Sequence, residues 1–317
     1  MNRTILILPD QIARNNSALM EVLKPERDAP PARILMIEAY DWLARGGLRK
    51  DELVFRLSAF RHFERELLRR KLTVDRIPVR DAGACSSMLD ALQAHVSSFA
   101  TDEFVVMEPT TVADATALRS LSCAAEIPVR FTPNTMFITA SWTQRGNILE
   151  LHRLYSALRT ELDILMDEGK PTGGLWCLTG DRISAGEALS HPELLIFPPD
   201  DISTAVMQMV ESVFPDSPGS TEGFSLPVTH AQANDLVDFF IQRGLLGAGC
   251  YESLAPLLGI GLLNPHHLVK KAETGFKTGK ISLQASEGLI RAVLGEREFL
   301  YIEDWKEHRP LADTRPE

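Results

Sequence analysis

Several signals that often reveal a function are missing from this chain of 317 residues. No apolar run approaches the roughly 20 residues that a helix needs to cross a bilayer. The apolar stretch Ile5–Leu8 is too short to be the core of a signal peptide. We therefore interpret Ile5–Leu8 as part of a first β-strand, and we predict a cytoplasmic protein with no membrane partner.

The sequence also lacks the spacings of a metal or disulfide framework. Its four cysteines are scattered, with no C-x-x-C pair, at Cys85, Cys123, Cys177 and Cys250. This scatter predicts reduced thiols rather than disulfides or a zinc site. The adjacent His266 and His267 do not indicate a metal pair, because neighbouring side chains on a helix diverge by roughly 100°. We interpret them as the solvated start of a helix after Pro265, and we predict no metal ligands.

Phosphate-binding motifs are absent too. Neither G-x-G-x-x-G nor a P-loop occurs, which disfavours a standard dinucleotide or nucleoside triphosphate site. The net charge of −10 argues mildly against autonomous nucleic-acid binding, because phosphate contacts depend on Lys and Arg. Basic residues are denser at 45–50, 61–71 and 266–280, but they do not alternate with aromatic residues as on a single-strand platform.

The composition is that of an ordinary soluble protein, with 44% hydrophobic and 24% charged residues. Its length allows about two domains. Short apolar runs without polar alternation predict strands buried on both faces of a parallel sheet. These runs are Thr4–Leu8, Ile34–Glu38, Val74–Val79, Phe104–Glu108 and Val129–Thr132.

Helical patterns separate these runs. Apolar residues at spacings of three and four predict helices over 53–67, 86–99 and 112–124. Alternating strands and helices favour a doubly wound α/β domain with right-handed crossovers. Ligands of such sheets lie beyond the carboxyl ends of the strands, where Asp10 and Glu38 stand. Turn or helix-cap roles for these two carboxylates remain an equal alternative.

The rest of the chain divides into two parts. Residues 133–225 form a connecting region with a helix over 147–168 and another after Pro198, capped by Asp201 or Ser203. From 226 the sequence reads helical, and Thr229 with Gln232 matches a capping box. We predict an α/β domain over 1–132, the connecting region, and a partial all-helical domain over 226–317.

Seven segments, in order along the chain, resemble motifs of one known family. The most specific are Leu57–Phe63, close to L-S-A-M-R-H-F, and Ser286–Phe299, close to a segment that reads E-G-F-I-R-Q-hydrophobic-L-G-W-R-E-F. The other five are Ile5–Ile12, Ile34–Glu38, Gly169–Trp176, Pro227–Ala233 and Leu254–Pro265. Together they resemble the photolyase-related, iron–sulfur bacterial cryptochromes and prokaryotic (6-4) photolyases.

This resemblance implies a fold and two chromophores. It implies an α/β antenna domain followed by a helical domain that holds FAD, with UV-damaged DNA as the partner. The family's antenna is a ribityl-lumazine near the first strands, so the resemblance implies antenna contacts for Asp10, Gln11 and Glu38. It implies flavin or lesion contacts for a second set in the helical domain. These residues are Ser253, Glu287, Arg291, Arg297 and Glu298.

Chemistry supports these roles, and a plainer alternative stands beside them. Guanidinium groups suit a flavin diphosphate or a DNA phosphate, and a carboxylate such as Glu298 can bind the base edges of a flipped lesion. We therefore take Glu298 as the candidate catalytic residue. In the alternative, the charged residues of this segment form surface salt bridges, since Glu287 and Arg291 have i,i+4 spacing.

The chain also departs from the family pattern. Ala255 and Gly259 replace a serine and an asparagine, and Glu296 replaces the tryptophan of G-W-R-E. The resemblance further implies that most of the helical domain, with its cluster-binding cysteines, lies beyond Glu317, so no iron–sulfur cluster is expected in this chain. An apolar face left by those helices would predict a homodimer or a partner chain.

Three functions follow from these patterns. The first is a light-dependent flavoprotein, either a DNA photolyase or a cryptochrome, and thus a lyase of the deoxyribodipyrimidine photolyase type if active. The second is a degenerate, non-catalytic relative that retains the α/β domain as a small-molecule or partner-binding module. The third, an unrelated nucleotide-handling enzyme, is the least supported because the phosphate loops are absent.

Overall fold

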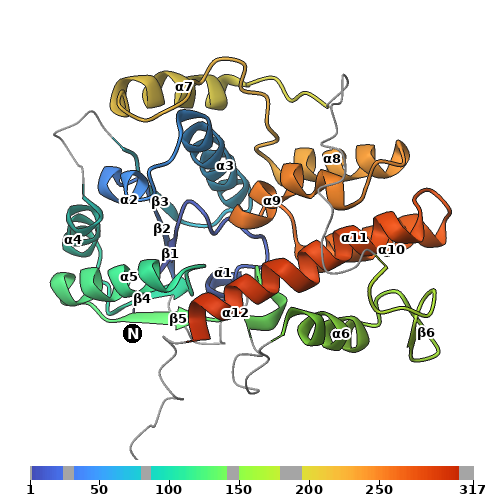
Figure 1. Ribbon diagram of the computed structural model, residues 1–317. Coiled ribbons are helices and arrows are strands. Elements are labelled where there is room, and N and C mark those ends of the chain that lie inside the picture. The colour runs from blue at the N-terminus through green and yellow to red at the C-terminus, as the bar shows by residue number, and fades with distance from the viewer. Residues whose placement is uncertain (1, 24–31, 80–86, 141–149, 179–194, 307–317) are drawn as a thin grey trace, which may run out of the picture.

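A parallel sheet of five strands forms the first part of the molecule (Figure 1). The computed structural model describes residues 2–23, 32–79, 87–140, 150–178 and 195–306. The strands are β1 (Arg3–Ile7), β2 (Arg33–Ile37), β3 (Val74–Ile77), β4 (Glu103–Met107) and β5 (Val129–Thr132). Their order, β3-β2-β1-β4-β5, reverses direction beside β1, as in a doubly wound fold. The predicted α/β class is confirmed.

Helices cover both faces of this sheet. Side chains alternate along β1, so that Ile5 and Ile7 enter one hydrophobic core while Leu6 and Leu8 enter another. Residues of α1 (Ser17–Leu23) and α3 (Lys50–Arg69) share the first core. Residues of α4 (Met88–Ser98) and α5 (Val112–Ala125) share the second. The short helix α2 (Tyr40–Ala44) contacts α4.

Capping residues set several helix starts. Ser87 caps α4, and Thr229 forms the predicted capping box with Gln232 at α8 (His230–Gln242). The helix α7 (Asp201–Val213) was predicted to be capped by Asp201 or Ser203, and both predictions are wrong. The cap is Asp200, whose side chain accepts a hydrogen bond from the Ser203 amide.

The first residues of the helix predicted over 147–168, 147–149, lie outside the described ranges, and its carboxyl end comes earlier in the structure than predicted. The helix is α6 (Leu151–Leu162), which ends at Asp163 in a left-handed conformation with φ of 50°. A small antiparallel pair follows, β6 (Met166–Asp167) with β7 (Lys170–Pro171). The apolar pattern continues past the helix end because Ile164 and Leu165 are also buried, which explains the overlong prediction.

The last part of the chain is helical, as expected. After α8 come η2 (Ala248–Cys250), α9 (Tyr251–Ile260) and α10 (Pro265–Lys277). Three segments then continue one another in a long helix, drawn in red-orange in Figure 1, which we call the rod. The rod consists of α11 (Leu283–Arg291), a π-helical turn η3 (Ala292–Arg297) and α12 (Glu298–Lys306).

The helical part docks directly on the sheet. The Ile12 amide donates to the Ile260 carbonyl at 2.9 Å. At the far end of the rod, the indole nitrogen of Trp305 donates to the Thr110 carbonyl at 3.1 Å. Asp304 accepts from the Val112 amide at 2.9 Å. Both parts also share the first hydrophobic core, so they pack as one body.

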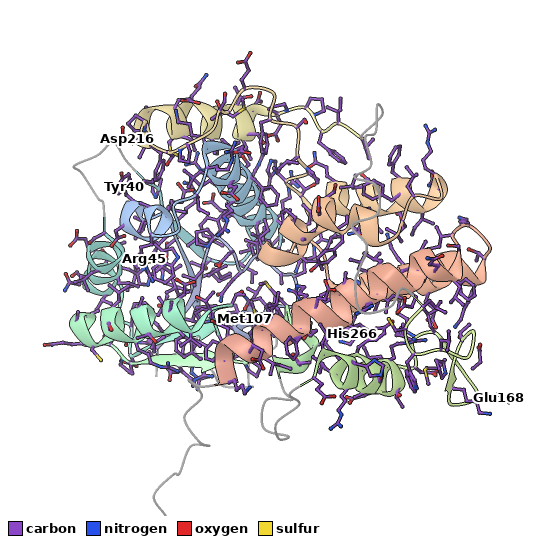
Figure 2. All side chains as sticks on the ribbon, in the orientation of Figure 1. Tyr40, Arg45, Met107, Glu168, Asp216 and His266 are labelled. Atoms are coloured by element: carbon purple, nitrogen blue, oxygen red, sulfur yellow. The ribbon has the colours of Figure 1, made fainter. Side chains whose placement is uncertain are left out.

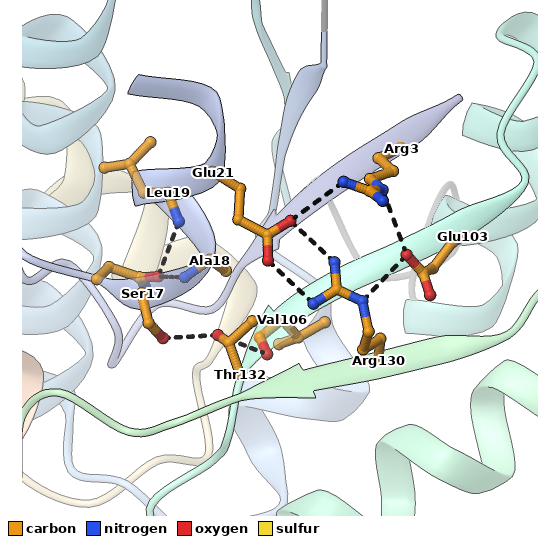
Figure 3. Close-up of polar contacts among 10 residues, drawn as sticks. Arg3, Ser17, Ala18, Leu19, Glu21, Glu103, Val106, Arg130 and Thr132 are labelled. Carbon is orange, nitrogen blue, oxygen red and sulfur yellow. Dashed lines mark hydrogen bonds and ion pairs between the residues drawn. The ribbon is translucent and has the colours of Figure 1, made fainter. Parts of the chain in front are cut away.

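A charged cluster closes the opposite, amino-terminal edge of the sheet (Figure 3). Arg130 of β5 binds both carboxylate oxygens of Glu21 at 2.9 and 2.8 Å and also reaches Glu103 at 3.2 Å. Arg3 lies 3.7 Å from each of these two glutamates. Three strands (β1, β4 and β5) and the helix α1 are thus joined at this edge by charged groups that all have partners.

Candidate functional site

The carboxyl edge of the sheet brings together the residues predicted to hold a small molecule. Asp10 and Gln11 follow β1, Glu38 follows β2, and Thr110 lies in the turn after β4. Figure 2 labels Met107, the last residue of β4, at this edge. The Gln11 amide nitrogen donates to the Met107 carbonyl at 2.6 Å, so it is held by the neighbouring strand.

Glu38 is held by two arginines. Its carboxylate is buried and accepts two hydrogen bonds from Arg61, both at 2.8 Å, and a third from Arg76 at 3.2 Å. The Val79 amide adds a fourth at 3.2 Å. This bidentate network joins β2 and β3 to α3. The structure therefore gives Glu38 a bracing role at this edge, and its contact with an antenna stays a prediction.

Three polar atoms at the same edge of the sheet have no such partners. Asp10 Oδ1, Gln11 Oε1 and Thr110 Oγ1 are buried and make no hydrogen bond within the described part of the chain. Burial raises the pKa of Asp10, which Arg56 opposes and the charge of Asp114 reinforces. Unpaired buried acceptors cost free energy unless a ligand or water pairs with them. The edge is thus chemically suited to a ligand with hydroxyl or N–H donors.

Glu298, the predicted catalytic carboxylate, lies inside the protein at the start of α12. It is fully buried and accepts from the Ile138 and Thr139 amides at 3.1 and 2.9 Å. The Thr139 hydroxyl donates to it at 2.7 Å, and Arg297 donates at 3.2 Å. Both carboxylate oxygens therefore hold the chain segment after β5 against the rod. A catalytic role for Glu298 stays a prediction.

Arg297 completes the same joint. Its guanidinium donates to the Met136 carbonyl at 2.9 Å and to the Leu258 carbonyl at 3.4 Å. It also lies 3.8 Å from the centre of the Phe137 ring, a cation–π distance. Burial lowers the pKa of Arg297, which the charge of Glu298 opposes. The two residues thus form a buried pair that links α9, the rod and the segment after β5.

Glu287 contacts the helix α6, and Arg291 contacts the segment after β7. The Tyr155 hydroxyl donates to Glu287 at 2.9 Å, while the other carboxylate oxygen of Glu287 has no partner among the described residues. Arg291 donates to the Cys177 sulfur at 2.8 Å. Both charged residues are at most 5% exposed. The alternative of surface salt bridges at this spacing is therefore wrong for this pair.

Ser253 stands apart from the other predicted flavin contacts. It lies on a solvent-open face of α9. Three neighbours on this helix, Glu252, Pro256 and Gly259, are exposed as well. α9 itself adjoins the π-turn of the rod, because Arg297 donates to the Leu258 carbonyl at 3.4 Å. π-Turns within helices frequently mark functional sites.

The sequence reasoning missed two residues of this region. Arg159 is fully buried, and its guanidinium donates to the carbonyls of Ile164, Leu165 and Trp176. Tyr155 holds Glu287, and burial raises its pKa. Both follow Leu151 at steps of four, so they continue the buried stripe of α6. This spacing in the sequence could have identified both residues as buried.

Comparisons with known proteins identify the family. A family model described as deoxyribodipyrimidine photo-lyase-related protein matches residues 5–226, well over half of the chain. The chain belongs to this family. The match ends before α8, so it covers the α/β part and the connecting region of this photolyase-related chain.

Two relatives extend the likeness to the helical part. The photolyase-related chain is 26% identical to a (6-4) photolyase of Agrobacterium fabrum, with 95% of this chain and 62% of that protein covered. Its fold is similar to the crystal structure of a bacterial class III photolyase from Agrobacterium tumefaciens, with a TM-score of 0.54 and 14% identity. That match covers 95% of this chain and 58% of the other. The chain thus spans about 60% of the length of these relatives.

Three features of the described residues of the photolyase-related chain concern membrane-spanning helices, metal sites and disulfides. In the parts that the structure describes, every helix is too short or too polar to cross a membrane. Across the same residues, His, Cys, Asp and Glu form no group of three or more that could hold a metal ion. Cys123 and Cys250 form no disulfide, and Cys85 lies outside the described residues.

Proposed function

We propose that this photolyase-related chain is a flavoprotein that binds FAD and repairs UV-induced pyrimidine dimers in DNA in a light-dependent reaction. The observation that carries the proposal is the position of α9, which exposes Ser253 and whose Leu258 carbonyl accepts a hydrogen bond from Arg297 of the π-turn of the rod. On this proposal the protein acts in the cytoplasm, a reducing compartment in which cysteines stay reduced.

The described residues fit a flavin through two distinct roles. The Ser253 hydroxyl and the Tyr251 phenol are accessible enough to bind it. Arg297 and Glu298 would act indirectly, because their hydrogen bonds fix the rod as one wall of the site. Tyr155 would support that wall from α6 through its hydrogen bond to Glu287 of the rod. When bound, FAD supplies light absorption and the transferable electron, while the protein supplies position and electrostatics.

Absorbance spectroscopy of the purified chain tests this proposal. We expect flavin bands after incubation with FAD, and we expect them to bleach under blue light with a reductant. Replacing Ser253 with Tyr should abolish FAD binding at unchanged thermal stability, because an exposed side chain is replaced. Ser212→Tyr, at an exposed position of α7, is the matched control and should bind FAD normally. A protein that stays colourless with excess FAD would reject the proposal.

A second candidate function, a small-molecule-binding α/β module, is favoured by the unpaired atoms at the carboxyl edge. Asp10 Oδ1, Gln11 Oε1 and Thr110 Oγ1 can accept hydrogen bonds from a polyol such as a ribityl chain. A ribityl-lumazine at this edge would serve either as an antenna for FAD or as the ligand of a non-catalytic relative. Fluorescence titration with a lumazine and with FAD separates these two functions.

Asp10→Asn should stabilise the ligand-free protein at neutral pH. Burial raises the pKa of Asp10 in the folded state above its value in the unfolded chain. Between these two pKa values the native state binds more protons than the unfolded state, so the free energy of unfolding falls as pH rises. Asparagine removes this penalty, and its advantage should shrink as pH falls toward about 4, the ordinary Asp pKa. Urea unfolding at both pH values measures this, with the exposed Asp216→Asn as control. A variant less stable than the parent at pH 7 would contradict the expectation.

A further inference from the structure

Arg56 is a charged residue on the inward face of α3. Leu53 precedes it by three positions, and Phe60 and Phe63 follow it by four and seven, so all four side chains project from one face of the helix. The three apolar residues are at most 2% exposed and belong to the first hydrophobic core. Arg56 is partly exposed, and it makes no hydrogen bond or ion pair within the described part of the chain. The donors of its guanidinium are therefore available to a ligand.

The course of α3 places Arg56 at the carboxyl edge of the sheet. β2 and β3 run parallel, so the helix between them returns from the carboxyl edge to the amino edge. Arg61, in the middle of α3, binds Glu38 directly after β2. Arg56 lies five residues earlier, about 7.5 Å nearer the start of the helix. It therefore lies past the end of β2, at the same edge as the unpaired atoms of Asp10 and Thr110.

Arg56 and Asp10 influence each other by charge without a direct contact. Burial raises the pKa of Asp10, and the charge of Arg56 opposes that rise. The two side chains form no ion pair, and Asp10 Oδ1 has no partner among the described residues. Gln11, which is fully buried, and the partly exposed Thr110 also have an unpaired oxygen each. An unpaired donor beside unpaired acceptors is complementary to a ligand that offers both kinds of group.

Other arginines around this edge already have partners. Arg61 and Arg76 both bind Glu38, as described above. Arg45, at the end of α2, pairs with a carboxylate of α5 at 3.3 Å. A ligand can therefore bind the guanidinium of Arg56 without breaking an ion pair in the described structure, whereas each of the other three would have to give one up.

The usual position for a phosphate at this edge is occupied. In doubly wound folds a phosphate binds at the amino terminus of a helix that follows a strand at the switch point. Here the Val112 amide of α5 donates to Asp304 of the rod at 2.9 Å, and the Asp114 amide donates to the Thr111 hydroxyl at 3.2 Å. The carboxylates of Asp10, Asp114 and Asp304 would also repel a phosphate. These surroundings favour a neutral ligand over a phosphorylated one.

We propose that Arg56 is a ligand-binding residue of the carboxyl edge, and that this site selects a neutral pyrimidinedione with a polyol chain over its phosphorylated form. Arg56 donates to a carbonyl oxygen of the ring, while Asp10, Gln11 and Thr110 accept hydrogen bonds from the hydroxyl groups of the polyol. The inference rests on the second candidate function, a small molecule bound at this edge. It adds the residue that binds the ring and the class of ligand that the site rejects.

Riboflavin and its 5′-phosphate test the proposal, because they differ in the phosphate group alone. Both are titrated by fluorescence into the full chain carrying Ser253→Tyr, so that the proposed FAD site does not contribute. We expect riboflavin to bind about tenfold or more tightly than its phosphate. Arg56→Met should weaken riboflavin binding about tenfold or more, because it removes a hydrogen bond from a charged donor. Arg65→Met removes the same charge at an exposed position of α3 and should leave binding unchanged.

Thermal unfolding without ligand separates this role from a structural one. Arg56→Met should unfold at the same or a higher temperature, because methionine extends the apolar face of α3 and no ion pair is lost. Lower riboflavin affinity at this unchanged or higher stability supports the proposal. Riboflavin binding that Arg56→Met leaves unchanged, or equal affinity for the two ligands, overturns the proposal but leaves the second candidate function standing. A protein that binds neither ligand overturns both.

Discussion

Replacing Glu298 with Ala should destabilise the protein by about 3–5 kcal/mol, the range for removing one partner of a buried charged pair. The substitution leaves the amide of the fully buried Thr139 and that of the partly buried Ile138 without an acceptor. It also leaves Arg297 buried without its carboxylate. Urea unfolding monitored by circular dichroism gives the change in free energy.

A surface glutamate on the same helix is the control. Glu303 is exposed and lies 3.4 Å from Lys306, so Glu303→Ala should cost less than about 1 kcal/mol. A second variant, Glu298→Gln, separates a structural from a catalytic role, since a catalytic carboxylate loses activity as glutamine even where stability is kept. Equal stability of Glu298→Ala and Glu303→Ala would contradict the structural role described here.

Gly261→Ala should cost about 3 kcal/mol or more. Gly261 has a φ of +89°, in the left-handed region, and an added Cβ would lie 2.7 Å from the backbone nitrogen of Ala13. Backbone strain of about 1–3 kcal/mol would therefore combine with overpacking of similar size. The clash is with backbone rather than with a flexible side chain, so relief requires the α9–α10 turn to move away from the sheet. Thermal and urea unfolding measure the loss.

Gly259→Ala is a matched control two residues away. Gly259 lies within α9, and an added Cβ there would meet nothing within 4 Å. Alanine should stabilise the protein by up to about 1 kcal/mol, because it restricts the unfolded chain and favours the helix. Opposite signs at two neighbouring glycines would identify the docking turn as the cause. A loss at Gly259 comparable to that at Gly261 would reject this explanation.

The strands of the sheet could be predicted from the sequence because the apolar pattern that indicates each strand lies within that strand's own residues. The apolar runs of β1, β2 and β4 are continuous, as expected for strands buried on both faces, and each was placed within one residue. The capping box of Thr229 and Gln232 was equally readable, since its two residues are three positions apart.

The environment of the charged residues in the rod could not be predicted in this way. Their partners come from distant segments: Tyr155 binds Glu287, Cys177 binds Arg291, and Thr139 binds Glu298. The i,i+4 spacing of Glu287 and Arg291 is equally compatible with a surface pair and with two buried groups. The tertiary contacts decide between these, and no local pattern contains them.

The rod has a consequence for the two chromophores of the proposed function. It runs over residues 283–306, about 36 Å at 1.5 Å per residue, and its far end is hydrogen-bonded beside the carboxyl edge of the sheet. Its middle is hydrogen-bonded to α9 through Arg297 and the Leu258 carbonyl. Energy transfer between two pigments depends steeply on their separation and relative orientation. A continuous helix anchored at both places fixes the distance between the two proposed chromophore sites. The optical coupling of an antenna to a flavin would therefore be set by the backbone rather than by loop motions.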